Sequence, residues 1–263
     1  MTSKQLITAG IDIGAATAKV VILKGGKILS ALVIPTGGSV KEASRLVMEK
    51  ALGEAQLSLD DITSVVATGY GRKSVDFANH VITEISCHAR GVNLLIPSAR
   101  SVIDIGGQDS KVIEVNDQGR VVNFAMNDKC AAGTGRFLEV MATVLGTDIG
   151  EIGSLSLQGQ KPCQISNTCT VFAESEMVSL RAEGENRENI LAGIHLAMAH
   201  RVAIMGNTVG LKEEIVFTGG VAKNVGMKMA LQKRIGKEIR VPEQPQIIGA
   251  LGAAAIGAQR LRA

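Results

Sequence analysis

The chain of 263 residues carries a formal net charge of +3, and 46% of its residues are hydrophobic but only 2% are aromatic. This length supports one large domain or two ordinary ones, and an aliphatic core with 30 glycines for tight turns is typical of an α/β protein. The low charge, the absence of Trp and the single Tyr argue against a nucleic-acid surface built on charge and base stacking.

The first half of the chain, residues 1–98, is predicted to open with three strands and to close with a helix. Gly25 and Gly26 separate two apolar runs and indicate a tight hairpin. Ser39 precedes a helical pattern, and Glu42 follows it at the spacing of a capping box. The predicted strands cover 6–13, 18–24, 27–34 and 62–69, and the predicted helices cover 39–55 and 84–96.

The second half, residues 99–263, restarts the same pattern. Aligning Ile11 with Ile103 gives six identical residues in ten positions, at an offset of 92 residues. A duplicated unit of this kind predicts two similar α/β lobes, 1–98 and 99–263, with a C-terminal helix at about 246–263 packing back on the first. The predicted strands cover 100–107, 111–115, 120–126 and 213–220, and the predicted helices cover 131–146, 172–184, 189–210, a segment from about Asn224, and 249–261.

Asp12 and Asp104 each stand at the carboxyl end of a predicted strand, directly before glycines. Backbone N–H groups in a glycine turn can approach a phosphate closely, and a carboxylate can hold Mg²⁺ through its water shell. Either loop by itself is equally well explained as a hairpin turn. Phosphate contact is favoured for Lys19 and less so for Lys111, since an outward lysine on a strand commonly faces solvent. Retention of the Asp in both copies favours a pair of loops that clamp a triphosphate. The predicted phosphate and Mg²⁺ residues are Asp12, Gly14, Ala15, Ala16, Thr17 and Lys19 in the first loop, and Asp104, Gly106, Gly107, Gln108 and Asp109 in the second.

Two further segments, VFTGGVAKN at 216–224 and IIGALGAAA at 247–255, are rich in small residues that leave room for a flat ligand against the backbone. No Walker-type GxxxxGK[ST] and no GxGxxG occurs in the chain. Together with the Asp loops, these segments resemble the five-motif nucleotide site of the actin, hexokinase and heat-shock chaperone ATPase superfamily. The resemblance implies that ATP occupies a cleft between the lobes, with Gly219, Gly220, Asn224, Gly249 and Ala250 on the adenosine side.

The four cysteines are expected to be reduced thiols in a cytoplasmic protein. No stretch approaches the roughly 18 apolar residues of a membrane helix, and the N-terminus lacks a signal-peptide core. Cys130 and Cys169 each immediately precede a predicted helix, whose N-terminus would stabilise a thiolate. A cysteine usually just fills core volume, but this shared setting suggests one metal site, and Cys163 and Cys87, which lack it, are expected to be structural.

Two cysteines cannot hold a 4Fe-4S cluster, which needs four thiolates. A twofold dimer would bring the same two residues of each chain to its axis and supply them. An intrachain zinc site made from Cys130, Cys163, Cys169 and a His remains open, although no CxxC-type spacing supports it.

The segments NDKCAAGTGRFLEVMA, NTCTVFAESE, IDIGGQDSK and FTGGVAKN resemble the activator family of 2-hydroxyacyl-CoA dehydratases, whose relatives include the ATPase subunits of benzoyl-CoA reductase. The resemblance covers essentially the whole chain. It implies an oxygen-sensitive homodimeric ATPase with one 4Fe-4S cluster bridging the subunits through Cys130 and Cys169. It also implies a ferredoxin or flavodoxin as electron donor, and a dehydratase, a benzoyl-CoA reductase-like enzyme or a double-cubane cluster protein as acceptor.

Two other functions remain open at this point. A sugar or acetate kinase of the same superfamily would usually be longer and has no need for the two cysteines. A nucleotide-responsive regulator or filament protein would need neither a cluster nor an electron acceptor. Among the remaining polar residues, Glu174 and Glu176 are expected to lie in the first turn of a helix and to interact favourably with its dipole. His195 and His200 are expected to be structural.

Overall fold

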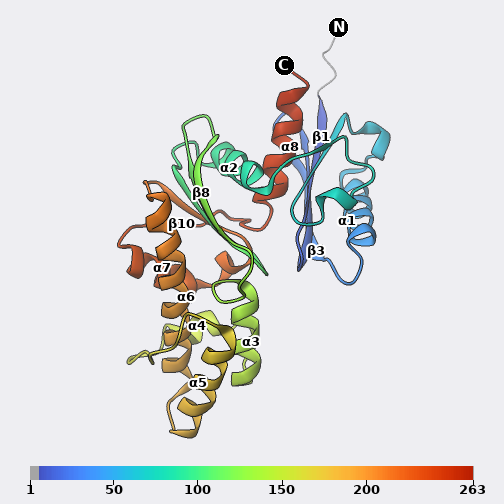
Figure 1. Ribbon diagram of the computed structural model, residues 1–263. Coiled ribbons are helices and arrows are strands. Elements are labelled where there is room, and N and C mark those ends of the chain that lie inside the picture. The colour runs from blue at the N-terminus through green and yellow to red at the C-terminus, as the bar shows by residue number, and fades with distance from the viewer. Residues whose placement is uncertain (1–5, 263) are drawn as a thin grey trace. The chain divides into compact units, whose positions relative to one another are not determined.

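A computed structural model describes residues 6–262, which form two compact units. The first unit contains the described residues up to Ala99, Val115–Val122 and the segment from Gln246 onward, and the second contains Arg100–Glu114 and Asn123–Pro245. Two five-stranded sheets, one centred on β1 and the other on β6, build the units (Figure 1). The predicted α/β class is therefore confirmed.

The first unit places its sheet between α1 on one face and α2 and α8 on the other (Figure 1). Ser39 begins α1 as predicted, because its side chain accepts a hydrogen bond from the Glu42 N–H. Gly25 and Gly26 make the hairpin with positive φ angles of 57° and 88°. The sheet has the order β3-β2-β1-β4-β5, with β1 Ile7–Ile13, β2 Thr17–Lys24, β3 Lys27–Pro35, β4 Ser64–Thr68 and β5 His80–Val81. The helices are α1 Val40–Ala55, α2 Glu84–Leu95 and α8 Ile248–Arg260, with short 3₁₀ turns η1 Leu59–Asp61 and η2 Arg72–Ser74.

The small-residue run in α8 serves close packing inside the first unit. A Cβ on Gly252 would lie 1.7 Å from the Cys87 carbonyl oxygen in α2, and a Cβ on Gly10 of β1 would lie 1.9 Å from the Ala250 carbonyl oxygen. Glycine is therefore required where α8 touches both its helical and its strand neighbour.

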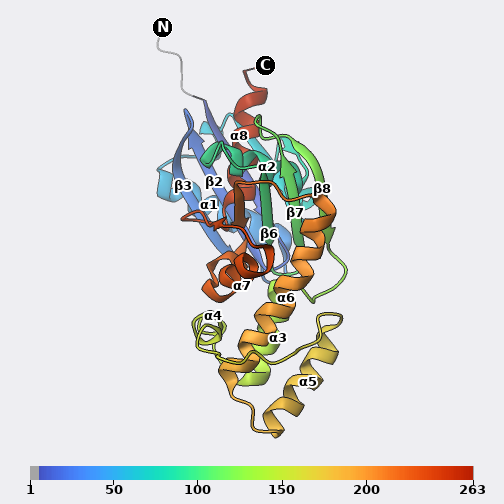
Figure 2. The same cartoon turned by 90° about the vertical axis from the view of Figure 1, so that its left-hand side faces the viewer.

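The second unit packs its sheet and helices around one hydrophobic core that includes Phe137, Met177 and Phe217. Helices α3, α5 and α6 lie side by side in both views (Figures 1 and 2). The sheet has the order β10-β9-β6-β7-β8, with β6 Ser101–Ile105, β7 Ser110–Val115, β8 Val121–Asn127, β9 Ile215–Thr218 and β10 Ile239–Arg240. The helices are α3 Gly135–Leu145, α4 Ile152–Ser156, α5 Thr170–Ala182, α6 Arg187–Val209 and α7 Val225–Ile235, with a 3₁₀ turn η3 Gly220–Lys223.

The sequence repeat corresponds to the same strand register in both units. Asp12 of β1 pairs across the antiparallel neighbour with Lys19, and Asp104 of β6 pairs in the same way with Lys111. The short elements β5, β10 and α4 were not predicted, because each is too brief to show a period. Within residues 6–262, no helix combines the length and apolar character needed to cross a bilayer.

Candidate functional site

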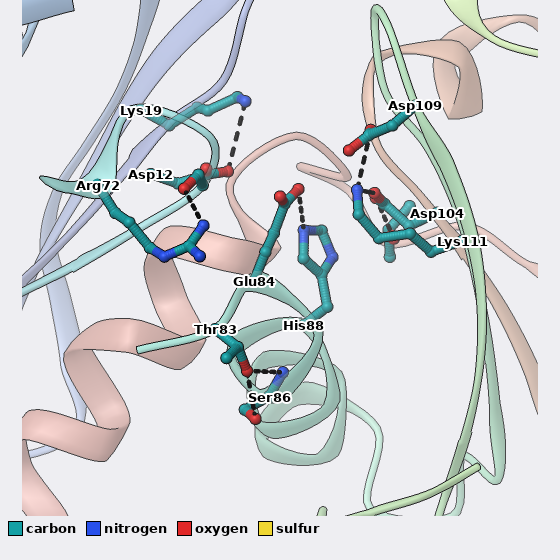
Figure 3. A network of polar contacts seen from close by, with 12 residues as sticks. Asp12, Lys19, Arg72, Thr83, Glu84, Ser86, His88, Asp104, Asp109 and Lys111 are labelled. Carbon is teal, nitrogen blue, oxygen red and sulfur yellow. Dashed lines mark hydrogen bonds and ion pairs between the residues drawn. The ribbon is translucent and has the colours of Figure 1, made fainter. Parts of the chain in front are cut away.

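The first predicted loop surrounds a buried carboxylate, Asp12, at the carboxyl end of β1. Asp12 is 2% exposed, and Lys19 Nζ lies 3.4 Å from its Oδ2 (Figure 3). Its Oδ1 is buried and has no hydrogen-bond partner among the described residues. The turn itself closes through the Gly14 N–H, which donates to the Thr17 carbonyl oxygen over 3.0 Å. A buried carboxylate oxygen without a donor is a favourable ligand for a cation.

Two residues that the sequence analysis missed, Glu84 and His88 of α2, lie beside Asp12. His88 Nε2 is 3.8 Å from Glu84 Oε1 (Figure 3). Glu84, His88 and Asp12 each offer one atom that could bind a metal ion, and these three atoms lie within 4.8 Å of one another. Their spacing of four residues puts both side chains on one helical face. That spacing was readable, but nothing in the sequence indicated that this face meets β1.

Gly249 and Ala250, predicted on the adenosine side, are buried in the first unit. A Cβ on Gly249 would lie 2.9 Å from Asp12 Oδ2 and 3.0 Å from His88 Nε2, so this glycine lets the carboxylate and the imidazole approach. Ala250 is 0% exposed and packs against β1. Their contact with adenosine stays a prediction.

The second loop surrounds Asp104 at the carboxyl end of β6. Thr218 Oγ1 donates to Asp104 Oδ1 over 2.8 Å, and Lys111 Nζ lies 3.2 Å from Asp104 Oδ2 and 2.9 Å from Asp109 Oδ1 (Figure 3). One ammonium group therefore lies between two carboxylates, and both carboxylates are of the type that binds Mg²⁺.

The alternative in which Lys111 faces solvent is wrong, because its side chain is 0% exposed. Lys19 is also largely buried, at 14%. Side chains along a strand point alternately to the two faces of the sheet. Lys111 pairs directly with Asp104 on the neighbouring strand, so both side chains lie on the same face. Thr218 was missed as well, although Thr68-Gly69 and Thr218-Gly219 repeat the same dipeptide in the two halves.

Backbone hydrogen bonds connect the second loop to α3. The Gly135 N–H donates to the Gly106 carbonyl oxygen and the Arg136 N–H to the Gly107 carbonyl oxygen, each over 2.8 Å. Gln108 is exposed beside them. The loop is therefore hydrogen-bonded to the first turn of α3, and the segment containing Cys130 leads directly into that turn.

Gly219, Gly220 and Asn224 follow β9 in the second unit. Gly219 has a φ of +88° and donates its N–H to the Pro245 carbonyl oxygen, and Gly220 is exposed. Asn224 caps α7, since its Oδ1 accepts a hydrogen bond from the Met227 N–H. Gly220 therefore exposes its backbone, whereas the Gly219 N–H and the Asn224 side chain already have structural roles.

His195 of α6 is structural, as predicted. Its Nδ1 lies 2.7 Å from the Leu191 carbonyl oxygen and its Nε2 lies 3.1 Å from Asn224 Oδ1. Burial lowers the pKa of this imidazole, and the two hydrogen bonds oppose that effect. His195 therefore stays neutral in the folded protein at pH values where the unfolded chain is already protonated.

We expect His195→Gln to weaken the acid sensitivity of the fold. Because the folded-state pKa is the lower one, the unfolded chain binds more protons below about pH 6.5, and stability falls as the pH drops through that value toward the folded pKa. Urea unfolding at pH 7.5 and 5.5, followed by circular dichroism, measures the difference. The control His200→Gln, also on α6, should keep the wild-type loss, and an equal loss in His195→Gln would contradict the prediction.

Cys130 and Cys169 lie in two loops of the second unit that touch. Cys130 Sγ is 3.9 Å from the Thr168 carbonyl oxygen, and both thiols are partly exposed. Cys169 is the N-cap residue of α5, as expected. The expectation for Cys130 is wrong, because α3 begins five residues later at Gly135. Gly133, with a φ of +93°, and the extended Thr134 form a turn between them.

The remaining cysteines lie in different surroundings. Burial raises the pKa of Cys87 to about 12, and burial followed by the nearby Glu185 raises the pKa of Cys163. Both effects disfavour a thiolate and support structural roles. Within residues 6–262, no group of three or more potential metal ligands contains a cysteine, so the intrachain zinc alternative receives no support. The expectation for Glu174 and Glu176 is wrong, because neither lies in the first turn of α5. Glu176 Oε2 instead accepts a hydrogen bond from the Ser166 N–H.

Comparison with known proteins matches residues 9–257 to the BadF/BadG/BcrA/BcrD ATPase family. The chain is 49% identical, over 95% of its length and 94% of the relative, to a 2-hydroxyisocaproyl-CoA dehydratase activator of Clostridioides difficile. Its fold matches the crystal structure of component A of (R)-2-hydroxyglutaryl-CoA dehydratase of Acidaminococcus fermentans, with a TM-score of 0.94, 42% identity and coverage of 98% and 100% of the two chains. It also matches an activator of 2-hydroxyisocaproyl-CoA dehydratase from Clostridium difficile with bound ADPNP, with a TM-score of 0.92, 47% identity and coverage of 98% and 96%.

Proposed function

Because the chain belongs to the BadF/BadG/BcrA/BcrD ATPase family, we propose that it hydrolyses ATP to pass one low-potential electron to a 2-hydroxyacyl-CoA dehydratase. The observation that carries this proposal is the contact between the Cys130 and Cys169 loops, with Cys130 Sγ 3.9 Å from the Thr168 carbonyl oxygen, in the unit that also holds the second Asp loop. A kinase or a regulator has no use for two adjoining, partly exposed thiols.

The thiol pair fits a shared iron–sulfur cluster better than any site within one chain. Two cysteines per chain are half of the four thiolates that a 4Fe-4S cluster requires, so a homodimer with the cluster on its twofold axis completes the set. Cys130 and Cys169 would hold the cluster, which supplies one-electron transfer at low potential when bound. Cys163 and Cys87 take no part, consistent with their raised pKa values.

Asp12 and Asp104 are proposed to serve Mg-ATP, with the turns at Gly14–Thr17 and Gly106–Asp109 donating N–H groups to its phosphates. The buried Oδ1 of Asp12, which has no hydrogen-bond partner among the described residues, supports the binding of a cation at the first loop, and the two carboxylates that meet at Lys111 place acidic oxygens at the second. That both loops act on one ATP molecule rests on the sequence repeat. Gly219 and Gly220 would lie against the adenosine.

The coupling of ATP to the electron is proposed to run through α3. The Gly106–Gly107 loop accepts hydrogen bonds from the first N–H groups of α3, and the Cys130 loop precedes that helix. A change in the loop on ATP binding or hydrolysis would therefore alter how the Cys130 thiolate is held, and so favour one of two arrangements. A ferredoxin or flavodoxin would reduce the dimer again after each transfer.

Anaerobic purification tests this function directly. We expect a brown protein with a broad visible absorbance that dithionite bleaches, and an ATPase activity that supports turnover of an added 2-hydroxyacyl-CoA dehydratase. A kinase or a regulator would be colourless under the same conditions. A colourless, iron-free protein that nevertheless hydrolyses ATP would overturn the electron-transfer proposal and keep the ATPase.

A further inference from the structure

Arg201 of α6 contacts both cysteine loops. Its Nη1 donates to the Asn167 carbonyl oxygen over 3.1 Å, two residues before Cys169. Its aliphatic stem lies against Gly133, three residues after Cys130, where a Cβ would be 3.0 Å from Arg201 Cδ and 3.4 Å from Nε.

The Cys130 loop is shaped to admit this side chain. Gly133 has a φ of +93°, a conformation that disfavours side chains, and any Cβ there would press on the Arg201 stem. The loop is held from its other side by Asn127, whose Nδ2 donates to the carbonyl oxygens of Cys130 and Ala132 over 2.9 and 3.2 Å.

The Cys169 loop is held by Glu176, whose Oε2 accepts a hydrogen bond from the Ser166 N–H over 2.6 Å. Asn127 and Glu176 each hold one loop, whereas Arg201 reaches both. The Arg201 Nε is buried without a hydrogen-bond partner among the described residues. A guanidinium keeps its charge at all relevant pH values, so a half-buried cation lies beside the two thiol-bearing loops.

We propose that Arg201 is a positioning residue for the thiolate pair. It fixes the Cys130 and Cys169 loops relative to each other and stabilises negative charge at them. The second part rests on the proposed function, since a cluster that accepts an electron gains one negative charge. A nearby cation stabilises that reduced form and raises the reduction potential. The first part does not depend on which metal the thiolates hold.

Arg201→Met keeps most of the aliphatic stem and removes the guanidinium N–H donors and the charge, whereas Arg201→Lys keeps a positive charge. The matched control is Arg181→Met, because Arg181 Nη1 also donates to a carbonyl oxygen of the same unit, that of Val144, over 2.7 Å. Amide hydrogen exchange over residues 130–134 and 166–169 reports how firmly the two loops are held. Iron content and an anaerobic redox titration followed by electron paramagnetic resonance report the cluster.

We expect Arg201→Met to speed exchange in both loops, to weaken iron binding by about tenfold to a hundredfold, and to lower the reduction potential. Arg201→Lys should restore the potential toward the wild-type value, which a purely structural role would not predict. Arg181→Met should leave all three measurements unchanged. Wild-type exchange rates in Arg201→Met would overturn the positioning role, and an unchanged potential in iron-loaded Arg201→Met would overturn the charge role.

The two levels of inference fail in different ways. If the wild-type protein holds no iron, the proposed function is wrong, while hydrogen exchange in the same protein still decides whether Arg201 holds the loops. If Arg201→Met does not fold, Gly133→Ala replaces it, because the added Cβ displaces the Arg201 stem without removing the charge. Unchanged exchange at Asn167 and Thr168 in that variant would then contradict the positioning role.

Discussion

Asp104→Asn is expected to reduce ATP hydrolysis by a factor on the order of 10² to 10³, as for the loss of other groups that stabilise charge in a transition state. The carboxylate of Asp104 lies at the end of β6 between Thr218 and Lys111 and is the group proposed to hold Mg²⁺. Asparagine keeps the volume and can accept the Thr218 hydrogen bond but carries no charge for the metal. Steady-state phosphate release under saturating Mg-ATP measures the loss.

The asparagine variant is preferable to alanine because of Lys111. Removing the whole side chain would leave a buried ammonium with fewer partners, and breaking a buried ion pair costs about 3–5 kcal/mol. In Asp104→Asn, Asp109 still lies 2.9 Å from Lys111, so the circular dichroism spectrum should match that of the wild type. Glu213→Gln, which removes a surface carboxylate paired with Lys237, is the charge-matched control and should retain activity. Full hydrolysis by a folded Asp104→Asn protein would contradict the assignment of this loop.

Cys169→Ser is expected to remove nearly all of the iron. A serine hydroxyl does not ionise at neutral pH and is a poor ligand for iron. In a symmetric dimer the substitution removes two of the four thiolates, one from each chain. Iron should fall from about four atoms per dimer to almost none, and the visible absorbance should disappear with it. Because the cluster would join the chains, sedimentation analysis should also show a weaker dimer.

Cys163→Ser is the matched control for this change. Cys163 lies only six residues away, its N–H donates to the Asn189 carbonyl oxygen, and burial disfavours its thiolate. It should therefore keep the iron and the colour, whereas Cys130→Ser should behave like Cys169→Ser. Zinc in place of iron, or iron retained in Cys169→Ser, would rule out the proposed ligand set.

The strands and helices that local patterns specify were predictable from the sequence. The Gly25-Gly26 hairpin and the Ser39 cap follow from residues that adjoin each other, and the repeat around Asp12 and Asp104 appears in the structure as the same strand register in both units. Cys169 at the start of α5 follows from the same kind of local pattern.

The Cys130 turn shows why a local pattern can still mislead. The residues Ala131 to Gly135 have helix-compatible neighbours, but the positive φ of Gly133 admits the Arg201 stem and delays the helix to Gly135. The contact with α6 lies outside any window around Cys130, whereas Thr134, of a residue type favoured at N-caps, marks the later start locally.

The sequence by itself determined the α/β class and the repeat that puts Asp12 and Asp104 at the ends of equivalent strands, because both follow from local patterns of apolar residues and glycines. The choice of Cys130 and Cys169 as ligands stays a prediction. Only the tertiary structure decided that Lys111 is buried between Asp104 and Asp109, that Glu84 and His88 face Asp12, and that Asn224 is occupied as the cap of α7. These placements arise when strands and helices distant in the sequence pack together, and the burial of a charge is set by what covers it.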